Sequence, residues 1–214
     1  MSPSAASPDP LGPLRSRSWL DEARRKAIHL AFLILPYELI HEQLPWPRGR
    51  RQFALLFAIL TAIAIAIDAL RLHEQRVKRF FREFLGGLIR EHEAFSLLGS
   101  TYLLLASLLA IEIFPQPVAA AALGYTVLGD AFGALVGRAY GRHRFFGKSL
   151  EGAAGCLLAC LAWAAYVSAI GAVPAGVAVA GALLATIVEI LPIPLDDNLG
   201  ITLASGYLMK WLTA

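Results

Sequence analysis

Long apolar stretches, separated by short charged or turn-forming segments, dominate the pattern of this chain. A stretch of about 18 or more residues with few charges is long enough to cross a bilayer as an α-helix. We count seven such stretches, of which the first is interrupted by polar residues and the last is short: 27–44, 53–70, 95–114, 118–137, 153–170, 175–195 and 199–212. The pattern predicts an all-α, polytopic integral membrane protein with about seven transmembrane helices.

Two further segments complete the expected organisation. Residues 71–90 are rich in arginine and lysine, and we expect them to form one basic helix at the membrane interface. Residues 1–18 are rich in proline, serine and alanine and lack the continuous apolar stretch of a signal peptide, which predicts a disordered N-terminal tail. Residues 19–214 are expected to form a single transmembrane domain.

The distribution of lysine and arginine predicts the orientation of the chain, because cytoplasmic loops of membrane proteins carry an excess of these residues. With a cytoplasmic N-terminus, the N-terminal segment, residues 71–90 and residues 138–148 all face the cytoplasm, and together they hold 15 of the 19 Lys and Arg residues. The exceptions are Arg48, Arg50, Arg51 and Lys210. This orientation places the loop 138–152 and the turn 196–198 on the same, cytoplasmic, side.

Apolar residues make up 57% of the chain and charged residues 16%, which excludes a soluble enzyme, a disordered chain and a secreted disulfide scaffold. The expected partner is the lipid bilayer. No basic patch is interleaved with aromatic residues, so nucleic acid is not an expected partner. The two cysteines, Cys156 and Cys160, lie four positions apart in one apolar stretch and are expected to pack as small buried residues.

A charged residue at bilayer depth is costly and therefore points to function. Asp130 lies inside the stretch 118–137, whereas Glu38 and Glu112 lie near the ends of their stretches, where a structural role is favoured. Glu189 precedes the turn at 192–197, and a role in orienting that turn is as well supported as any other. Asp130 also belongs to a ladder of glycines spaced by four, which brings another helix close, either within one chain or in a homo-oligomer: Gly129, Gly133, Gly137 and Gly141.

The loop 137–152 that follows this ladder combines glycines, arginines, Lys148 and Ser149. Ser149 is predicted to cap the N-terminus of the next helix, with Glu151 in its first turn opposing the helix dipole. A helix N-terminus beside a lysine also suits an anion, and glycines let backbone amides approach a phosphate. The glycine spacing is not that of a Walker A loop.

The third candidate element is Asp196-Asp197-Asn198, between the last two stretches. It is either a solvated turn, with Asn198 as a helix cap, or a cluster of hard oxygen ligands suited to Mg²⁺. Carboxylates that hold Mg²⁺, combined with lysine and arginine for phosphate oxygens, are what phosphoryl or nucleotidyl transfer requires. The residues alone predict a Mg²⁺-dependent enzyme acting on a nucleotide or phosphate at the bilayer surface, with a lipid as the acceptor.

These motifs together resemble the polyprenol kinase family, which includes dolichol kinase, phytol kinase and the CTP-dependent diacylglycerol kinases. The resemblance covers roughly residues 24–205 and is carried by Gly129-Asp130-Ala131, Gly137, Gly141, Lys148-Ser149-Leu150-Glu151-Gly152 and Asp196-Asp197-Asn198-Leu199, with Lys26-x-x-His29, Asp68-x-x-Arg71 and Arg90-x-x-Glu93 upstream. It implies transfer of the terminal phosphate of a nucleoside triphosphate, typically CTP, to a lipid alcohol. That alcohol is a polyprenol, a phytol-like alcohol or diacylglycerol.

The resemblance also implies a role for each matching position. Asp130, Lys148 and Glu151 are expected to be catalytic, and either Asp130 or Glu151 accepts the hydroxyl proton. Asp130, Asp196 and Asp197 are expected to hold Mg²⁺. The expected nucleotide-binding residues are Gly129, Gly137, Gly141, Arg142, Arg144, Lys148, Ser149, Gly152 and Asn198, and those facing the lipid or its headgroup are Lys26, His29, Arg90 and Glu93.

Two other functions remain open at this point. Phosphatidate cytidylyltransferases resemble the same stretch, but they usually lead into Glu-Gly with a Ser-Pro-Lys-Lys-Thr-like segment, where this chain has Gly147-Lys148-Ser149-Leu150. A small membrane transporter also uses intramembrane acids and glycine ladders. The polar residues of this chain gather at one predicted face, which favours the enzyme.

Overall fold

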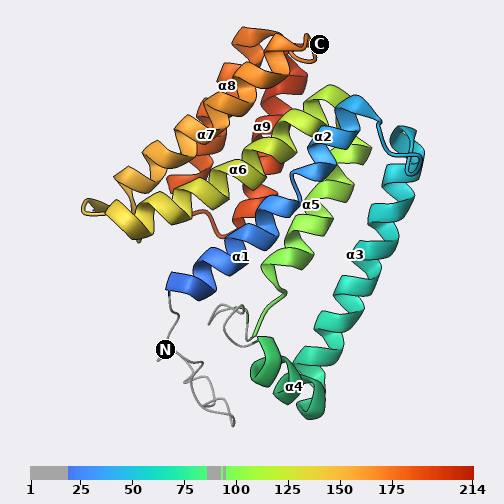
Figure 1. Cartoon of the computed structure of the whole chain (residues 1–214), viewed down its shortest axis with the longest axis vertical. Coiled ribbons are helices and arrows are strands. Elements are labelled where there is room, and N and C mark those ends of the chain that lie inside the picture. Colours follow the sequence, from blue (N-terminus) through green and yellow to red (C-terminus); the bar gives the residue numbers. More distant parts are fainter. Residues whose placement is uncertain (1–18, 86–92, 94) are drawn as a thin grey trace, which may run out of the picture.

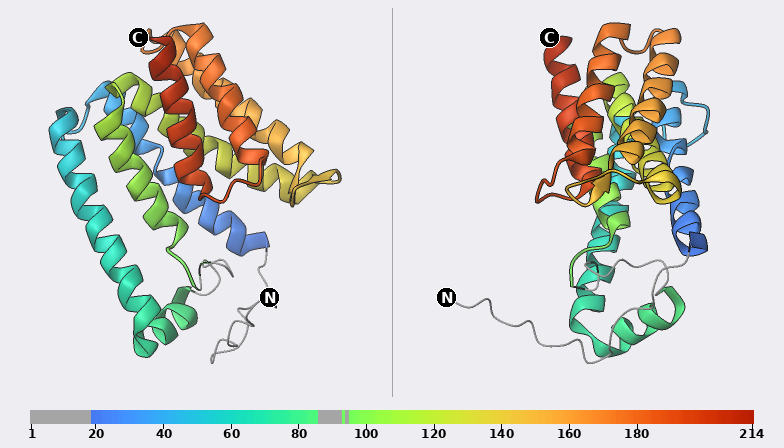
Figure 2. Two further views of the ribbon diagram at one scale, coloured as in Figure 1. Left: turned by 180° about the vertical axis from the view of Figure 1, so that it is seen from behind. Right: turned by 90° about the vertical axis from the view of Figure 1, so that its left-hand side faces the viewer.

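The computed structural model describes residues 19–85, 93 and 95–214 and is all-α apart from one small hairpin (Figures 1 and 2). The predicted tail 1–18, Arg90 and the end of the predicted basic helix lie outside the described residues. The described helices are α1 (Trp19–Ala31), α2 (Ile34–His41), α3 (Gly49–His73), α4 (Gln75–Leu85), α5 (Gly99–Ile113), α6 (Gln116–Tyr140), α7 (Leu150–Ala169), α8 (Ala175–Ile190) and α9 (Asp197–Leu212). Strands β1 (Arg144–Phe145) and β2 (Lys148–Ser149) pair antiparallel.

Helix α6 is the centre of the bundle. It contacts α7, α8 and α9 on one side and α1, α2 and α5 on the other (Figure 1). Its first half contains a run of alanines, Ala119–Ala122. Their small side chains are fully buried and let neighbouring helices approach closely. A polar group on the inner part of α6 is therefore enclosed by other helices.

The glycine ladder of α6 packs against α7 of the same chain. A Cβ placed on Gly129 would lie 3.0 Å from the sulfur atoms of Cys156 and Cys160, and one on Gly137 would lie 3.4 Å from the Cα of Gly152. Both cysteines are free and buried, as expected. Of the two possibilities that the sequence left open for the ladder, the structure uses it within one chain.

Three helices are long and apolar enough to cross a membrane: α3, α6 and α7. Helices α5 and α8 are apolar but have 15 and 16 residues, about 23 and 24 Å at 1.5 Å per residue, which is less than the bilayer core of about 30 Å. Along α3, large apolar side chains such as Leu55, Ile59 and Ile63 are at least half exposed. This surface suits lipid better than water, and the chain has the helices of a membrane protein.

The first expected span is not one helix. The chain turns at residues 32 and 33, which separates α1 from α2, and the amides of Phe32 and Leu33 bond to carbonyls three positions earlier. Pro36 explains the break, because proline has no N–H to continue the hydrogen bonding of a helix from residue 32. The expected stretch 27–44 is therefore two helices and not one continuous helix.

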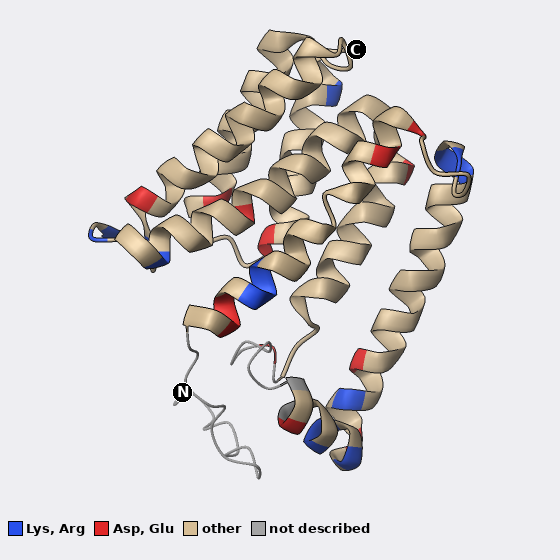
Figure 3. Ribbon diagram, in the orientation of Figure 1, with Lys and Arg blue, Asp and Glu red and all other residues tan. Residues whose placement is uncertain are grey.

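Two basic residues outside the predicted cytoplasmic clusters have a structural role at the end of α5. The guanidinium of Arg50 donates to the carbonyl oxygen of Glu112, and Lys210 Nζ donates to that of Ile113 at 3.0 Å. Figure 3 shows basic positions, in blue, at the start of α3 and near the C-terminus. The last carbonyls of a helix have no partner within it, and cations are favourable at this negative end. Arg50 and Lys210 thus supply hydrogen-bond donors to the last carbonyl oxygens of α5.

Candidate active site

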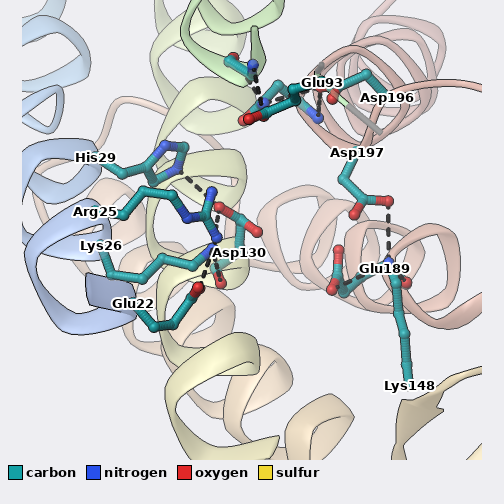
Figure 4. A network of polar contacts seen from close by, with 12 residues as sticks. Glu22, Arg25, Lys26, His29, Glu93, Asp130, Lys148, Glu189, Asp196 and Asp197 are labelled. Carbon is teal, nitrogen blue, oxygen red and sulfur yellow. Dashed lines mark hydrogen bonds and ion pairs between the residues drawn. The ribbon is translucent and has the colours of Figure 1, made fainter. Parts of the chain in front are cut away.

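Asp130 of α6 forms a buried ion pair with α1. Lys26 Nζ lies 2.5 Å from Asp130 Oδ2 and donates to the Asp130 carbonyl oxygen at 2.9 Å. His29 Nε2, one turn further along α1, lies 3.4 Å from the same carboxylate oxygen. Lys26 is fully buried and Asp130 is 6% exposed. The prediction that Asp130 lies inside the protein is confirmed, and α1 supplies its countercharge (Figure 4).

Lys148 forms a second cluster of charges with α8 and α9. It lies on β2, directly after a tight hairpin turn in which Phe146 and Gly147 both have positive φ angles. Lys148 Nζ lies 3.0 Å from Asp197 Oδ1 and 3.2 Å from Glu189 Oε1 (Figure 4). Burial opposes the charge of Lys148, but the two carboxylates outweigh it, so the pKa of Lys148 is raised above its ordinary value.

The contact between Lys148 and Asp197 also tests the expected topology. It joins the loop 138–152 to the turn 196–198, so these two segments lie at the same end of the bundle, as predicted. The α7–α8 and α5–α6 turns lie toward the other end (Figures 1 and 2).

Ser149 caps α7, as predicted. Its hydroxyl accepts a hydrogen bond from the Gly152 amide at 3.0 Å. Glu151, in the first turn, accepts bonds from the backbone amides of Arg142 and His143 and lies 2.7 Å from His143 Nδ1. The Glu151 carboxylate therefore holds the preceding loop, and neither Glu151 nor Arg142 lines the cavities described below.

The adjacent acids Asp196 and Asp197 have different surroundings. Asp196 is the N-cap of α9, and its Oδ1 accepts from the backbone amide and the side-chain amide of Asn198, both at 2.9 Å. The sequence offered Asn198 as the helix cap, and the structure places the cap two residues earlier, at Asp196. Asp197 instead projects toward Lys148. Metal binding by Asp196 stays a prediction.

Two cavities meet at Asp130 and Asp197. The first, about 590 Å³ in volume, is lined by three basic residues, Arg138, Arg144 and Lys148, and by four acidic ones, Glu22, Asp130, Glu189 and Asp197. We call it the cationic cavity after its basic residues. The second, about 200 Å³, is the apolar cavity, to which Ile28 of α1, Phe81 of α4, Leu103 of α5 and the flanking residues Phe32 and Leu98 contribute. Asp130 and Asp197 line both cavities.

Most of the residues implied by the resemblance lie at these cavities. Besides the two shared aspartates, the cationic cavity includes Gly137, Arg144, Lys148, Ser149 and Gly152, and the apolar cavity includes His29, Glu93 and Asn198. Lys26 reaches the site through Asp130. Five further expected residues line neither cavity: Gly129 and Gly141, which lie close to α7 or its cap, and Arg142, Glu151 and Asp196.

The structure adds three charged residues to the cationic cavity that sequence reasoning did not assign to the site: Glu22, Arg138 and Glu189. Arg138 follows Asp130 by eight positions, a spacing that returns to nearly the same helix face, so this signal was present. The sequence indicated only that Glu189 precedes the turn at 192–197, and in the structure it forms an ion pair with Lys148. Nothing local in the sequence indicates that Glu22 belongs to the cavity.

A network from α3 holds one wall of the apolar cavity. Asp68 and Arg71 form an ion pair at 2.9 Å. Arg71 Nη1 donates to the Glu93 carbonyl at 2.8 Å, and Asp68 Oδ2 accepts from the Leu98 amide at 2.9 Å. Asn198 Nδ2 then bonds to the carbonyl of Gly99 at 3.2 Å, which connects this wall to α9.

Several oxygen atoms at the site are of the type that a hard divalent cation prefers as ligands. Within the described ranges no group of three or more His, Cys, Asp or Glu residues is close enough to hold a metal unaided. However, Glu189 Oε2 and Asn198 Oδ1 are buried and have no hydrogen-bond partner, which is costly unless something else binds them. Together with Asp130 and Asp197 they are carboxylate and amide oxygens, the ligand types of Mg²⁺, which commonly keeps waters and phosphates as further ligands.

Comparison with known proteins gives a limited result. No protein family model matches the chain, and no solved structure matches it. An uncharacterized protein of Rickettsia prowazekii (strain Madrid E) is 28% identical over 134 residues, which span 61% of this chain and 63% of that protein. The name of that protein states no activity, so the similarity carries none to this chain.

Proposed function

We propose that this protein is a lipid kinase that transfers the terminal phosphate of a nucleoside triphosphate, CTP by resemblance, to the hydroxyl of a membrane lipid alcohol. The observation that carries the proposal is that a cationic cavity and an apolar cavity meet at Asp130 and Asp197. A triphosphate requires cations and a lipid requires apolar walls. Phosphoryl transfer between them requires carboxylates at the place where the two substrates meet.

In this proposal, different residues of the site bind the phosphate, hold Mg²⁺ and accept the proton. Lys148, Arg138 and Arg144 bind phosphate oxygens in the cationic cavity. Asp130, Asp197 and Glu189, with Asn198, would hold Mg²⁺, which neutralises charge on the triphosphate. The lipid oxygen forms a bond to the terminal phosphorus while the bond to the leaving diphosphate oxygen breaks. The hydroxyl proton passes to Asp130, because Asp130 faces the apolar cavity whereas Glu151 is bound to the loop.

We further propose that seven segments cross the bilayer, with the N-terminus and the active site on the cytoplasmic side. The segments are α1 with α2, α3, α5, α6, α7, α8 and α9. The basic segment 138–148 belongs to the same end of the bundle as the site, which the positive-inside rule assigns to the cytoplasm. The short helices α5, α8 and α9 are accommodated by local thinning of the bilayer, at modest cost.

The test is a transfer assay with purified protein, Mg²⁺ and CTP labelled at either the α or the γ phosphate. The acceptors are a polyprenol, phytol, diacylglycerol and phosphatidate, each supplied separately. Label that reaches an alcohol from the γ position alone supports the kinase and identifies its acceptor. Label that reaches phosphatidate from the α position identifies a cytidylyltransferase instead. If neither label moves and no nucleotide binds, the protein is not a transferase, and a transport assay is the next experiment.

A further inference from the structure

Helix α4 has an apolar face that the described part of the chain leaves largely uncovered. Phe80 and Phe84 lie one turn apart with their ring centroids 4.8 Å from each other, and they are 54% and 67% exposed. Aromatic residues of this size are seldom so exposed in water without a binding partner.

The opposite face of α4 is basic. At 100° per residue, Lys78 and Arg79 lie about 120° and 140° around the helix from Phe84, and Arg79 is exposed. A helix with phenylalanines on one face and basic residues on the other suits the plane between lipid headgroups and acyl chains. Its cationic face is complementary to anionic headgroups.

The position of α4 agrees with such a partner. It begins two residues after α3 ends, and it runs across the end of α3 rather than continuing it (Figures 1 and 2). Helix α3 has the length of a membrane span and exposes apolar side chains up to Leu70, which is 54% exposed. The end of such a helix lies at the level of the lipid headgroups.

Phe81 connects this surface helix to the site. It follows Phe80 directly but lines the apolar cavity, together with Phe32, just after α1, and Leu98. A shift of α4 therefore moves one wall of that cavity. The phenylalanine pair Phe80 and Phe84 and the cavity residue Phe81 belong to one short helix.

We propose that α4 docks on a membrane surface containing anionic lipids, with Phe80 and Phe84 inserted, and that this contact positions Phe81 at the mouth of the apolar cavity. The effect on lipid entry rests on the proposed function of that cavity. The docking itself does not.

Docking is tested with a fluorescent thiol label on the Phe84→Cys variant. The native Cys156 and Cys160 are fully buried, so the label attaches at position 84. The protein is placed in bilayers of phosphatidylcholine alone or mixed with phosphatidylglycerol. We expect a blue-shifted emission in the mixed bilayers and a loss of the shift when Arg79→Glu is added. The matched control is Arg51→Glu, an exposed arginine at the other end of α3, which should leave the shift unchanged. Identical emission in both bilayers overturns the proposal.

Coupling to the site is tested by the KM of the lipid acceptor in the same bilayers. We expect phosphatidylglycerol to lower this KM by about fivefold, the effect of one basic residue at an anionic surface, and Arg79→Glu to abolish the effect. A blue shift with an unchanged KM overturns the coupling. A blue shift without any phosphate transfer leaves the docking in place and overturns the kinase.

Discussion

Lys26 and Asp130 lie 104 positions apart in the sequence and form an ion pair inside the protein, with Lys26 Nζ 2.5 Å from Asp130 Oδ2. Two buried charges are stable together because each compensates the other. The pair attaches α1 to the central helix α6 and holds the carboxylate at the place where the two cavities meet.

Replacing Lys26 should destabilise the protein. The Lys26→Met variant leaves the Asp130 carboxylate buried without its main partner, and we expect a loss of about 3–5 kcal/mol, measured by thermal unfolding in detergent. Arg24→Met, on the exposed face of the same helix, should change stability by less than about 0.5 kcal/mol. The double variant Lys26→Met/Asp130→Asn should recover part of the loss. Strictly additive effects would show that the two side chains do not interact.

The neighbouring acids Asp196 and Asp197 should differ in their effects on transfer. Asn is as good a helix cap as Asp, so Asp196→Asn should keep the stability of α9, and if capping is its role it should keep the activity too. Asp197→Asn should lower the transfer rate by about 10²–10³-fold, because it removes a charge at the reacting groups. The γ-label assay measures both variants. Equal losses would assign Asp196 to the metal after all, as the resemblance implies.

The ion pairs of Lys148 should stabilise the protein over the whole neutral range. Its pKa is raised, so the stabilisation is fully present below the ordinary lysine pKa and is lost as the pH rises through the raised value. The difference in unfolding free energy between the wild type and Lys148→Gln should therefore not decrease from about pH 7 to pH 9. A difference that disappears within this range would contradict the pairing with Asp197 and Glu189.

The close approach of α6 and α7 should tolerate no side chain at Gly152. A Cβ there would lie 2.8 Å from the Gly133 carbonyl oxygen and 3.1 Å from the Gly137 Cα. We expect Gly152→Ala to cost about 1–3 kcal/mol and to weaken nucleotide binding, since it pushes α7 and the preceding Lys148 away from α6. Gly176→Ala, with open space around it, is the matched control and should be neutral or slightly stabilising. Unfolding and nucleotide titration in detergent measure both.

Features that depend on neighbouring residues were predictable. A serine at the start of a helix commonly caps it by accepting a hydrogen bond from a backbone amide three positions later. The Gly152 amide donates such a bond to the Ser149 hydroxyl, as expected. The break in the first expected span also has a local cause, Pro36, because a proline inside an apolar stretch interrupts the hydrogen bonding of a helix.

The roles of the acids depended on contacts between distant segments. The sequence could not tell Asp196 from Asp197, because which of two adjacent carboxylates caps the helix and which meets Lys148 depends on the approach of β2. Glu189 was left undecided for the same reason.

The sequence by itself determined the helices, the membrane character and the presence of acidic, basic and glycine-rich segments that belong at one end of the bundle. These follow from apolar length and local hydrogen bonding, which act over a few residues. The tertiary structure decided that Lys26 neutralises Asp130, that Glu189 shares Lys148 with Asp197, and that two cavities of different character meet at these aspartates. A buried charge takes its partner from whichever helix packs against it, and that choice belongs to the packed bundle as a whole.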